Sequence, residues 1–278
     1  MEQNAATRAV VAADALAYDG CHERGGMNGT VPRCAALITG AGRRIGAAIA
    51  RALAREGYAV VLHAHRSRSE AEGTASEIAA AGGRASIVLA DLADGVALAG
   101  LVPAAAAFGP LTLLVNNASL FEEDDITTLD RAAFERTMAV NLSAPLFLAQ
   151  AFAAQAAAGA SIVNVVDQRV LKPTPRFFSY TLSKSALANA TLTLAQALAP
   201  NVRVNAVAPG PTLPSPRQSP AQFAAQAASV PLKRGPTPED IAAAVVYLAG
   251  AASVTGTVIA VDGGQHIAWR TLDSDGAE

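Results

Sequence analysis

Cysteine is scarce in this sequence, and the two that it has, Cys21 and Cys34, do not form a CxxC pair. Cys34 lies in an apolar run that predicts a buried strand, which argues against a disulfide framework. Because disulfides are typical of oxidising compartments, we expect a reducing, cytoplasmic compartment. Histidine is scarce too, with no HExxH motif and no Cys/His ligand spacing, so we expect no metal. The histidines are His22, His63, His65 and His266.

The sequence also lacks an excess of charge of one sign. Its 21 Lys and Arg residues nearly balance 23 Asp and Glu residues, which gives a formal net charge of -2. A chain of this charge offers no support for binding to nucleic acid or to a membrane surface. No uninterrupted apolar run approaches the ~20 residues of a membrane span. We therefore expect neither nucleic acid nor a membrane as a partner.

Residues 1–32 differ from the rest because they are polar, are Gly-rich near 25–29 and precede the first clear strand. A signal peptide would need a basic first region and a longer apolar stretch, and this segment has neither in proper form. We expect a loosely ordered extension before a single domain at 33–278. Met27 is a candidate true start, and an intact mass that includes residues 1–26 in protein made from its native gene would exclude it.

Apolar runs alternate with helical patterns from Cys34 onward, and 51% of the residues are hydrophobic, enough for a large core. Seven apolar strands alternating with helices predict an α/β fold with a parallel sheet covered on both faces. The expected strands are 34–39, 58–64, 85–90, 111–115, 161–166, 202–207 and 257–261. The expected helices are one carrying Ile45, Ile49 and Leu53 at i, i+4 and i+8, then 68–82, 94–108, 130–155 with Pro145 inside it, 178–199 and 238–249.

The Pro-rich segment 209–220 is predicted to be the main loop and a candidate lid over a site.

A glycine-rich turn, TGAGRRIG, joins the first expected strand to the first helix. Such a turn lets the backbone approach a pyrophosphate, whose charge meets the helix N-terminus. The spacing is GxGxxxG rather than GxGxxG, and Arg43 and Arg44 stand where glycine is expected. The alternative is an ordinary turn between a strand and a helix.

The second expected strand ends at His63, roughly 20 residues past the glycine turn. A carboxylate there would bind the ribose 2′-hydroxyl of NAD, and none is present. His65, Arg66 and Ser67 suit a 2′-phosphate instead, with Arg43 adding charge, which favours NADP(H). The alternative is a solvated basic loop.

Two polar segments follow the next strands. Asp91 can accept a hydrogen bond from an adenine amine, or it can cap the following helix. Asn116, Asn117, Ala118 and Ser119 follow the fourth strand, where polar amides and a small residue suit a ligand crevice. The alternative for this second segment is a plain turn.

Tyr180 and Lys184 lie four residues apart, so on a helix they share one face. The ammonium favours phenolate, which makes the proton of the phenol easier to donate near neutral pH. The alternative is a surface Tyr and Lys that happen to have this spacing.

Five motifs occur in the order TGAGRRIG, NNAS, VNLSAP, YTLSK and Pro209-Gly210, over about residues 33–265. Together they resemble the short-chain dehydrogenase/reductase family. The resemblance implies a Rossmann-like, doubly wound fold with strand order 3-2-1-4-5-6-7. It also implies a homotetramer built through the helices near 130–155 and 178–199 and the C-terminal segment.

The resemblance assigns roles to residues. Tyr180 would protonate the substrate, Lys184 would bind the nicotinamide ribose and tune Tyr180, and Asn141 would hold a water in the proton relay. The residues expected at the cofactor are Gly40, Arg43, Arg44, Ile45, Gly46, His65, Arg66, Ser67, Asp91, Leu92, Asn117, Ala118, Ser119, Tyr180, Lys184, Pro209 and Gly210.

Asp167 is a departure from the family, most of which has Ser or Thr about 13 residues before the Tyr. A hydroxyl there binds a substrate carbonyl oxygen, whereas a carboxylate repels charge developing on it. An aspartate suits a substrate that offers N–H donors or is protonated on nitrogen. The alternatives are that Asp167 lies outside the pocket, or that Gln168 replaces the Ser.

This aspartate and the arginine-containing turn resemble the pteridine reductases and the bacterial dihydromonapterin and dihydrofolate reductases. In that subgroup a pterin ring lies between the nicotinamide and an aromatic residue, which matches Phe121 here. Ser119 would contact the pterin or a cofactor phosphate, and Arg44 the pterin oxygen or a phosphate. The alternative for Phe121 is a loop residue packed on the core.

The expected function is therefore NADPH-dependent reduction of a C=N bond in a dihydrobiopterin-, dihydromonapterin- or dihydrofolate-type pterin. A general carbonyl or 3-oxoacyl-thioester reductase is the first competitor, and Asp167 argues against it. A non-catalytic NADP-binding sensor would be expected to lack Tyr180 or Lys184, and both are present. A structural or interaction protein would need neither the glycine turn nor this pair.

Overall fold

The structure is a computed structural model that describes residues 35–269. The expected N-terminal extension, Met27 and both cysteines lie outside these described residues. A seven-stranded sheet forms the centre, and every pairing in it is parallel. Its order, β3-β2-β1-β4-β5-β6-β7, confirms the predicted topology. The strands are β1 (Ala35–Ile38), β2 (Ala59–Ala64), β3 (Arg84–Leu89), β4 (Leu111–Asn116), β5 (Ala160–Val165), β6 (Val202–Pro209) and β7 (Val258–Val261).

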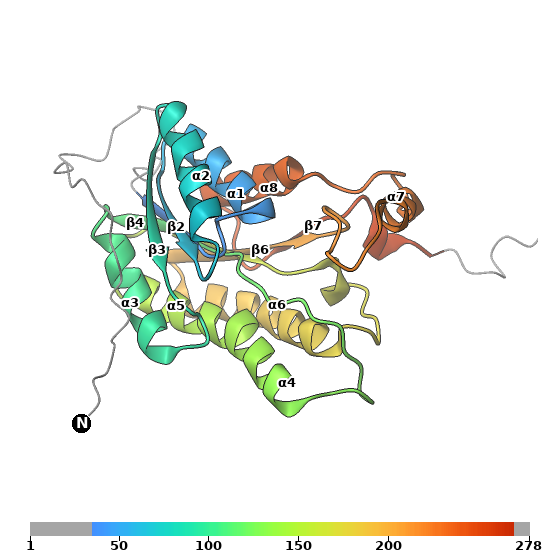
Figure 1. The fold of residues 1–278 in the computed structure, drawn as a ribbon. Coiled ribbons are helices and arrows are strands. Elements are labelled where there is room, and N and C mark those ends of the chain that lie inside the picture. The colour runs from blue at the N-terminus through green and yellow to red at the C-terminus, as the bar shows by residue number, and fades with distance from the viewer. Residues whose placement is uncertain (1–34, 270–278) are drawn as a thin grey trace, which may run out of the picture.

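Helices cover both faces of the sheet, as the continuous apolar strands predict. Figure 1 shows α1, α2 and α8 on one face, and α3, α4, α5 and α6 on the other. The short helix α7 lies beyond the end of β7. The helices are α1 (Arg44–Arg55), α2 (Arg68–Ala80), α3 (Gly95–Ala106), α4 (Arg131–Met138), α5 (Ala144–Ala153), α6 (Phe178–Leu198), α7 (Pro220–Ser229) and α8 (Pro238–Gly250).

The core consists mainly of two layers, one on each face of the sheet. Successive side chains of a strand point to opposite faces, and β1 divides in this way. Ala36 and Ile38 pack in the cluster beneath α1 and α8, whereas Ala35 and Leu37 pack in the cluster with α3 and α5. Full burial of each large aliphatic side chain contributes about 1.5–3 kcal/mol, so this strand is held from both sides.

The sheet places the predicted motifs side by side. β1 lies between β2 and β4, with Ile38 opposite both Leu62 and Val115. The segments that follow these three strands therefore emerge at one edge of the sheet. The order of the strands reverses between β1 and β4, which is where open α/β sheets have their ligand crevice.

The prediction of one helix over 130–155 is wrong in detail. The segment forms α4, then a five-residue π-helix at Ala139–Ser143, then α5. Pro145 lies in the first turn of α5, where its missing N–H removes the α-helical bond to the carbonyl of Asn141. A π segment accommodates this loss, and such segments are frequent at functional sites. Asn141 lies within it.

The predicted loop at 209–220 is bounded differently in the structure. β6 continues through Pro209, and a helix that was not predicted, α7, begins at Pro220. Ser219 and Gln222 form a capping box at its start. The candidate lid, called the lid below, is therefore the segment 210–219, held at its far end by a capped helix.

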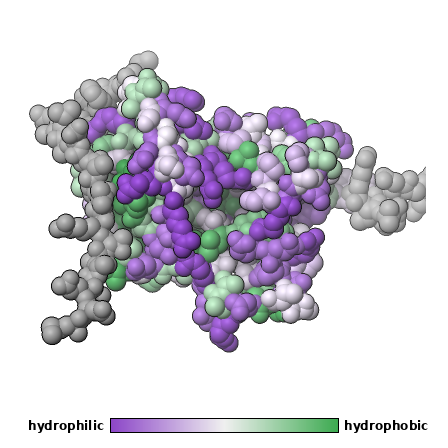
Figure 2. Space-filling model, viewed as in Figure 1, coloured by the Kyte–Doolittle hydropathy of each residue, from purple (hydrophilic) through white to green (hydrophobic). Residues whose placement is uncertain are grey.

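Figure 2 shows mainly hydrophilic residues on the face turned to the viewer, with apolar residues in small groups between them. Within residues 35–269, no helix has both the length and the apolar character needed to cross a membrane. The same residues contain no group of three His, Cys, Asp or Glu side chains placed to hold a metal ion.

Candidate active site

A cavity of about 710 Å³ opens at the reversal of strand order. Its walls come from the glycine turn, the ends of β2, β3 and β4, and the lid. Most of the predicted cofactor residues line it. These are Gly40, Arg43, Arg44, Ile45, Gly46, His65, Arg66, Ser67, Asp91, Leu92, Asn117, Ala118 and Ser119, together with the predicted substrate residue Phe121.

The glycine turn requires glycine at its two ends. Gly40 has φ +65°, a left-handed conformation that glycine adopts without strain. A Cβ on Gly46 would overlap the carbonyl oxygen of Gly40. The turn is therefore a close crossing of backbone on backbone, and the first residues of α1 line the cavity.

His63, which sequence reasoning assigned no role, holds this turn from below. Its Nδ1 accepts a hydrogen bond from the N–H of Gly40 at 3.2 Å, and its Nε2 lies 3.1 Å from the carbonyl oxygen of Ala90. Burial lowers the pKa of His63 to about 4. The imidazole is therefore neutral at pH 7. The available signal was a polar ring within an otherwise apolar strand.

Asn117 braces the turn from the side of β4. Its Nδ2 donates to the carbonyl oxygens of Thr39 (2.9 Å) and Gly40 (3.1 Å). The hydroxyl oxygen of Thr39 in turn accepts from the backbone N–H groups of Asn117 and Ala118, each at 3.0 Å. The Asn117 side-chain amide therefore binds the glycine turn. The segment is more than a plain turn, because it supports the glycine turn and lines the cavity.

A basic rim lines the cavity, with Arg43 from the glycine turn and His65, Arg66 and Ser67 from the segment after β2. Asp91 lies beside this rim and forms ion pairs with Arg136 (3.0 Å) and His65 (3.6 Å). The alternative that Asp91 caps the next helix is wrong, because Asp94 accepts the hydrogen bonds of the first turn of α3. Asp91 lines the cavity while its carboxylate accepts from the N–H of Ala93 at 3.0 Å and pairs with Arg136.

Arg44 ties the glycine turn to the lid. Its backbone has φ +56°, which is unusual for a residue with a side chain. Its guanidinium donates to the carbonyl oxygens of Pro214 at 3.0 Å and Leu213 at 3.3 Å. The sequence predicted that Arg44 reaches a pterin oxygen or a phosphate; in the structure it lines the cavity while bound to the lid.

Tyr180 and Lys184 are buried in the first turns of α6, with 7% and 2% of their surfaces exposed, so the alternative of a surface pair is wrong. Lys184 Nζ donates to the carbonyl oxygen of Val165 at 2.7 Å. Burial lowers the pKa of Lys184 to about 8, although Asp167 favours its charge. The ammonium lies 5.9 Å from the centre of the Tyr180 ring.

The expectation that the phenol of Tyr180 is acidified is wrong for this structure. Burial raises the pKa of Tyr180 well above 10, and the Asp167 carboxylate raises it further. The hydroxyl donates a hydrogen bond of 2.8 Å to Asp167 Oδ2. Lys184, four residues away, is the neighbouring charge in the sequence, whereas the nearest charge in the fold is the anion Asp167, 13 residues away.

Asp167 is fixed by the residues that follow it. Its Oδ1 accepts from the backbone N–H of Arg169 at 2.8 Å, and the Arg169 guanidinium lies 3.4 Å from both carboxylate oxygens. The Asp167 carboxylate, not the Gln168 amide, contacts Tyr180. The alternative that Gln168 replaces the family Ser beside Tyr180 is therefore wrong.

Phe177 is a neighbour that the sequence did not reveal. Its ring stacks on Phe121 with 4.3 Å between centroids and 5° between planes. Phe121 also meets Tyr180 edge to face at 4.6 Å. Phe121 therefore links the cavity, which it lines, to the buried Tyr180. Phe177 stands just before α6 with φ +57°, a strained conformation for a phenylalanine.

The segment 121–125 anchors the start of α6. The Asp124 carboxylate accepts from the backbone N–H of Ser179 at 3.1 Å and from its hydroxyl. From the lid, Arg217 donates to the carbonyl oxygen of Phe121 at 2.6 Å and pairs with Glu122 at 3.0 Å. These contacts position Tyr180, one residue after Ser179, relative to the cavity.

Asn141 is fully buried in the π segment and uses its amide within the protein. Its Oδ1 accepts from the N–H of Leu120 (2.8 Å) and the hydroxyl of Ser119 (3.2 Å). Its Nδ2 donates to the carbonyl oxygen of Leu120 (2.9 Å) and to Ser183 Oγ (3.1 Å). The side chain therefore holds the segment after β4 against α6.

Some predicted site residues do not line the cavity. Gly210 lies at the end of β6, where a Cβ would come within 2.6 Å of Asp262 Cα, so this glycine serves a close backbone crossing. Tyr180 reaches the cavity only through its contact with Phe121. The residues outside the lining are Asn141, Asp167, Tyr180, Lys184, Pro209 and Gly210.

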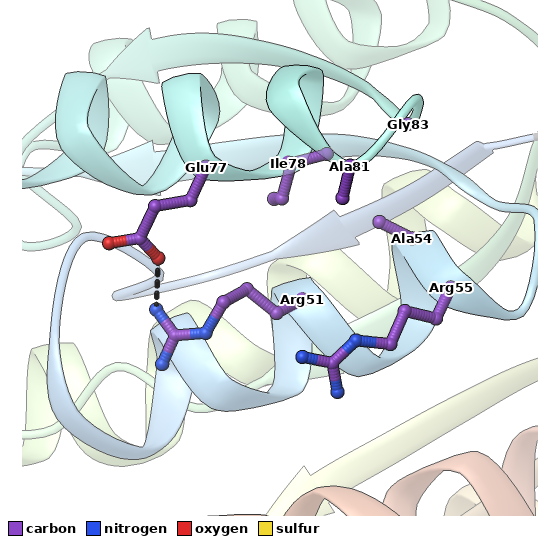
Figure 3. Close-up of a pocket in the computed structure, with 7 residues that line it drawn as sticks. All are labelled: Arg51, Ala54, Arg55, Glu77, Ile78, Ala81 and Gly83. Atoms are coloured by element: carbon purple, nitrogen blue, oxygen red, sulfur yellow. Dashed lines mark hydrogen bonds and ion pairs between the residues drawn. The ribbon is translucent and has the colours of Figure 1, made fainter.

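A second, much smaller cavity of about 60 Å³ lies between α1 and α2. Figure 3 shows Arg51 reaching across to Glu77, which it pairs with at 2.9 Å, while Arg55 extends alongside. This volume holds only about two water molecules. The cavity is therefore a gap between packed helices, with no room for a cofactor or substrate.

A family model described as "Enoyl-(Acyl carrier protein) reductase" matches residues 40–266. The chain belongs to the short-chain dehydrogenase/reductase family. This short-chain reductase is an oxidoreductase. The match spans the whole segment from the glycine turn to the residues after β7, so the site described above lies entirely within it.

Similar proteins include one named as a dihydrofolate reductase and others named as an oxidoreductase or a dehydrogenase. The crystal structure of FolM alternative dihydrofolate reductase 1 from Brucella suis, in complex with NADP, is 51% identical and has a TM-score of 0.83; the match covers 86% of this chain and 98% of that one. An uncharacterised oxidoreductase of Methylorubrum extorquens is 39% identical over 82% of this chain and 96% of its own. A galactitol 2-dehydrogenase of Cereibacter sphaeroides is 37% identical over 84% of this chain and 95% of its own.

Proposed function

We propose that this short-chain reductase uses NADPH to reduce a C=N bond of a pterin of the dihydrobiopterin, dihydromonapterin or dihydrofolate type. The observation that carries the proposal is the 2.8 Å hydrogen bond between the Tyr180 hydroxyl and the Asp167 carboxylate. A pterin presents N–H donors and basic ring nitrogens, which suit a carboxylate. The likeness to a dihydrofolate reductase at 51% identity supports the same substrate class.

The enzyme is an NADP-dependent oxidoreductase. The residues of the cavity fit this cofactor, because a Cβ on Gly46 would overlap the turn where a pyrophosphate approaches backbone. His65, Arg66 and Ser67 line the cavity after β2, and no carboxylate interrupts residues 63–67. A KM for NADPH well below that for NADH is expected, and the opposite preference would refute the 2′-phosphate assignment.

The chemistry divides between the cofactor and the protein. NADPH supplies the hydride when bound. Tyr180 gives its proton to the ring nitrogen next to the reduced carbon, and Asp167 accepts hydrogen bonds from N–H groups of the ring. Lys184 holds the nicotinamide ribose and places a positive charge near Tyr180. Replacing Tyr180 with Phe should cut the rate by about 10²–10⁴-fold, the usual effect of losing an acid or base.

Phe121 is proposed to bind the flat face of the pterin, where stacking adds roughly 0.5–1.5 kcal/mol beyond area burial. One face of Phe121 is covered by Phe177 in the structure. Arg44 and Ser119, which line the cavity, are proposed to contact the pterin or a cofactor phosphate. Asn141 is proposed to support the proton relay by holding the segment around Ser119 and Leu120.

A general carbonyl reductase is the second candidate, and the likeness to a galactitol 2-dehydrogenase favours it. The two candidates differ in what Asp167 does. A ketone develops negative charge on oxygen beside this carboxylate, which opposes the reaction. The carboxylate therefore favours the pterin.

NADPH oxidation against a substrate panel decides between them. The panel contains dihydromonapterin, dihydrobiopterin and dihydrofolate beside several ketones and a 3-oxoacyl thioester. We expect at least one pterin to give the highest kcat/KM. Turnover of ketones with no pterin activity would replace the proposal by the second candidate. Cofactor binding without turnover of any compound would favour a sensor.

We also propose that the enzyme is a homotetramer. Three large apolar side chains on α5 and α6 are at least 43% exposed, which supports packing of these helices against another copy. They are Phe147, Leu182 and Leu192. A solution mass measurement tests the proposal, and a monomer at micromolar concentration would contradict it.

A further inference from the structure

The proposed reaction places two negative charges side by side. When Tyr180 gives up its proton, the O–H bond breaks, the proton goes to the substrate nitrogen and the electron pair stays on the phenolate oxygen. That oxygen lies 2.8 Å from Asp167 Oδ2. Like charges at this distance repel strongly in a buried site. A short-chain reductase with a neutral hydroxyl at position 167 would not face this cost.

Two cations are close enough to offset the charge. Lys184 is the expected one, with its ammonium 5.9 Å from the centre of the Tyr180 ring. The other is Arg169, whose guanidinium nitrogen lies 3.4 Å from both oxygens of Asp167. Arg169 was not singled out by the sequence motifs, and it follows Asp167 by only two residues.

Arg169 is largely buried between the Asp167 carboxylate and two aromatic rings. Its side chain is 18% exposed, yet within the described part of the chain no group accepts a hydrogen bond from its Nε. Its guanidinium carbon lies 5.4 Å from the Phe121 centroid and 5.2 Å from the Phe177 centroid. These cation–π contacts hold the guanidinium against the two stacked rings, while its charge pairs with Asp167.

Stability does not explain the arrangement. Burying an ion pair costs desolvation that the Coulomb attraction often fails to recover, so such a pair is weak evidence for a stabilising role. The acidic partner of Arg169 among residues 35–269 is Asp167. Both charges of this pair are largely buried next to the one group that must change its charge in the reaction.

We propose that Arg169 is a positioning residue that keeps Asp167 compatible with catalysis, because its positive charge offsets the carboxylate while the neighbouring Tyr180 phenol loses its proton. The inference rests on the proposed role of Tyr180 as the acid. It does not require the substrate to be a pterin, because any reduction that takes a proton from Tyr180 creates the same pair of negative charges.

The electrostatics of Tyr180 agree with this role. Burial and the Asp167 carboxylate raise the pKa of Tyr180, and the charge of Arg169 lowers it. Two further titratable side chains near this site already have acidic partners. Arg217 pairs with Glu122, and His266, on the short helix packed against the Arg169 segment, pairs with Asp262 at 2.8 Å.

A double-mutant cycle tests the proposal. Arg169→Met is made in the wild type and in Asp167→Ser. The kcat of each enzyme is measured with two substrates of the panel. One is the substrate that its parent enzyme reduces best, and the other is a substrate that both parent enzymes reduce. In the wild type we expect kcat to fall by about tenfold or more, a part of the 10²–10⁴-fold effect of the acid, with KM changing less. In the Asp167→Ser background the same substitution should change kcat by less than about twofold, because no carboxylate remains to be offset.

Matched controls separate charge from shape. Arg169→Lys keeps the charge and should recover most of the lost kcat. Arg217→Gln removes a guanidinium that lies beside the same two rings, 5.7 and 5.8 Å from their centroids, but pairs with Glu122. Its effect on kcat should be the same in both backgrounds. Thermal melting of each variant checks that it folds.

A substrate-independent readout keeps failure of the proposed function separate. Phenolate absorbance is followed as the pH is raised. The part of the rise that is missing in Tyr180→Phe reports the ionisation of Tyr180 alone. Arg169→Met should move this rise to higher pH, and Arg217→Gln should not. A wild type inactive on pterins refutes the pterin proposal only. Equal losses of kcat in both backgrounds, or a phenolate rise that stays in place, would overturn the role of Arg169.

Discussion

The Tyr180 hydroxyl donates a 2.8 Å hydrogen bond to Asp167, and these two residues come from different ends of one crossover, the end of β5 and the first turn of α6. The bond makes the proton of Tyr180 harder to lose than in water, because an anion faces it. Cations must therefore assist the step, and the structure supplies Lys184 and Arg169 around the pair.

The pH dependence of the rate should follow Lys184. Its pKa of about 8 means that the ammonium is lost within the working range. The pKa of Tyr180 is raised well above 10, so Tyr180 stays protonated over that range. We expect kcat/KM, which reports the free enzyme, to decline above about pH 8. In Lys184→Arg the decline should disappear, since arginine stays charged. A wild-type profile that is flat to pH 10 would contradict this assignment.

The stability of the fold should fall in acid because of His63. Its pKa is about 4 in the folded enzyme and 6.5 in the unfolded chain, so between these values the unfolded chain binds more protons. The free energy of unfolding is therefore greatest above about pH 6.5 and declines as the pH falls towards 4. At about 1.36 kcal/mol per pKa unit, the shift from 6.5 to about 4 corresponds to a loss of about 3 kcal/mol.

Chemical denaturation at several pH values tests this. His63→Asn keeps an acceptor for the N–H of Gly40 and should flatten the decline, whereas His65→Asn, two residues along and partly exposed, should leave most of it. An equal slope in wild type and His63→Asn would show that other groups govern the acid limb.

The stack of Phe177 on Phe121 should compete with a flat substrate ring. If a pterin displaces the Phe177 ring, Phe177→Ala removes the competitor, and the KM for the pterin should fall by about 2–10-fold, which corresponds to the 0.5–1.5 kcal/mol of an aromatic pair. Phe121→Ala should raise the same KM, since it removes the surface on which the ring is proposed to stack. A higher KM in Phe177→Ala would mean instead that both rings hold the substrate.

Local patterns were enough to predict the sheet. The strands are mainly apolar runs, fully or almost fully buried except in β3 and β7, and all seven lie within two residues of their predicted bounds. α7 was missed because the prolines before it read as loop, although Ser219 and Gln222 have capping-box spacing. The π segment around Asn141 was missed because the spacing of apolar residues does not reveal one extra residue in a single helical turn.

The candidate site was predictable where a motif carries it and hidden where distant segments meet. The glycine turn and the basic residues after β2 line one cavity as expected. The contact of Asp124 with Ser179 spans 55 residues, and the stack of Phe121 on Phe177 spans a similar stretch. No periodicity links such positions. The direction in which the pKa of Tyr180 shifts was wrongly predicted for the same reason, since it depends on burial and on the contact with Asp167, which both arise on folding.

The most direct test of the account is the ratio of pterin to ketone turnover in Asp167→Ser compared with the wild type. The serine variant restores a hydroxyl beside Tyr180 and removes the carboxylate that is proposed to bind ring N–H groups. We expect kcat/KM for the best pterin to fall by far more than kcat/KM for a ketone, so that the ratio drops by at least about tenfold, or 1.4 kcal/mol. Pterin turnover unchanged in this variant would contradict the role of Asp167 on which the proposed function stands.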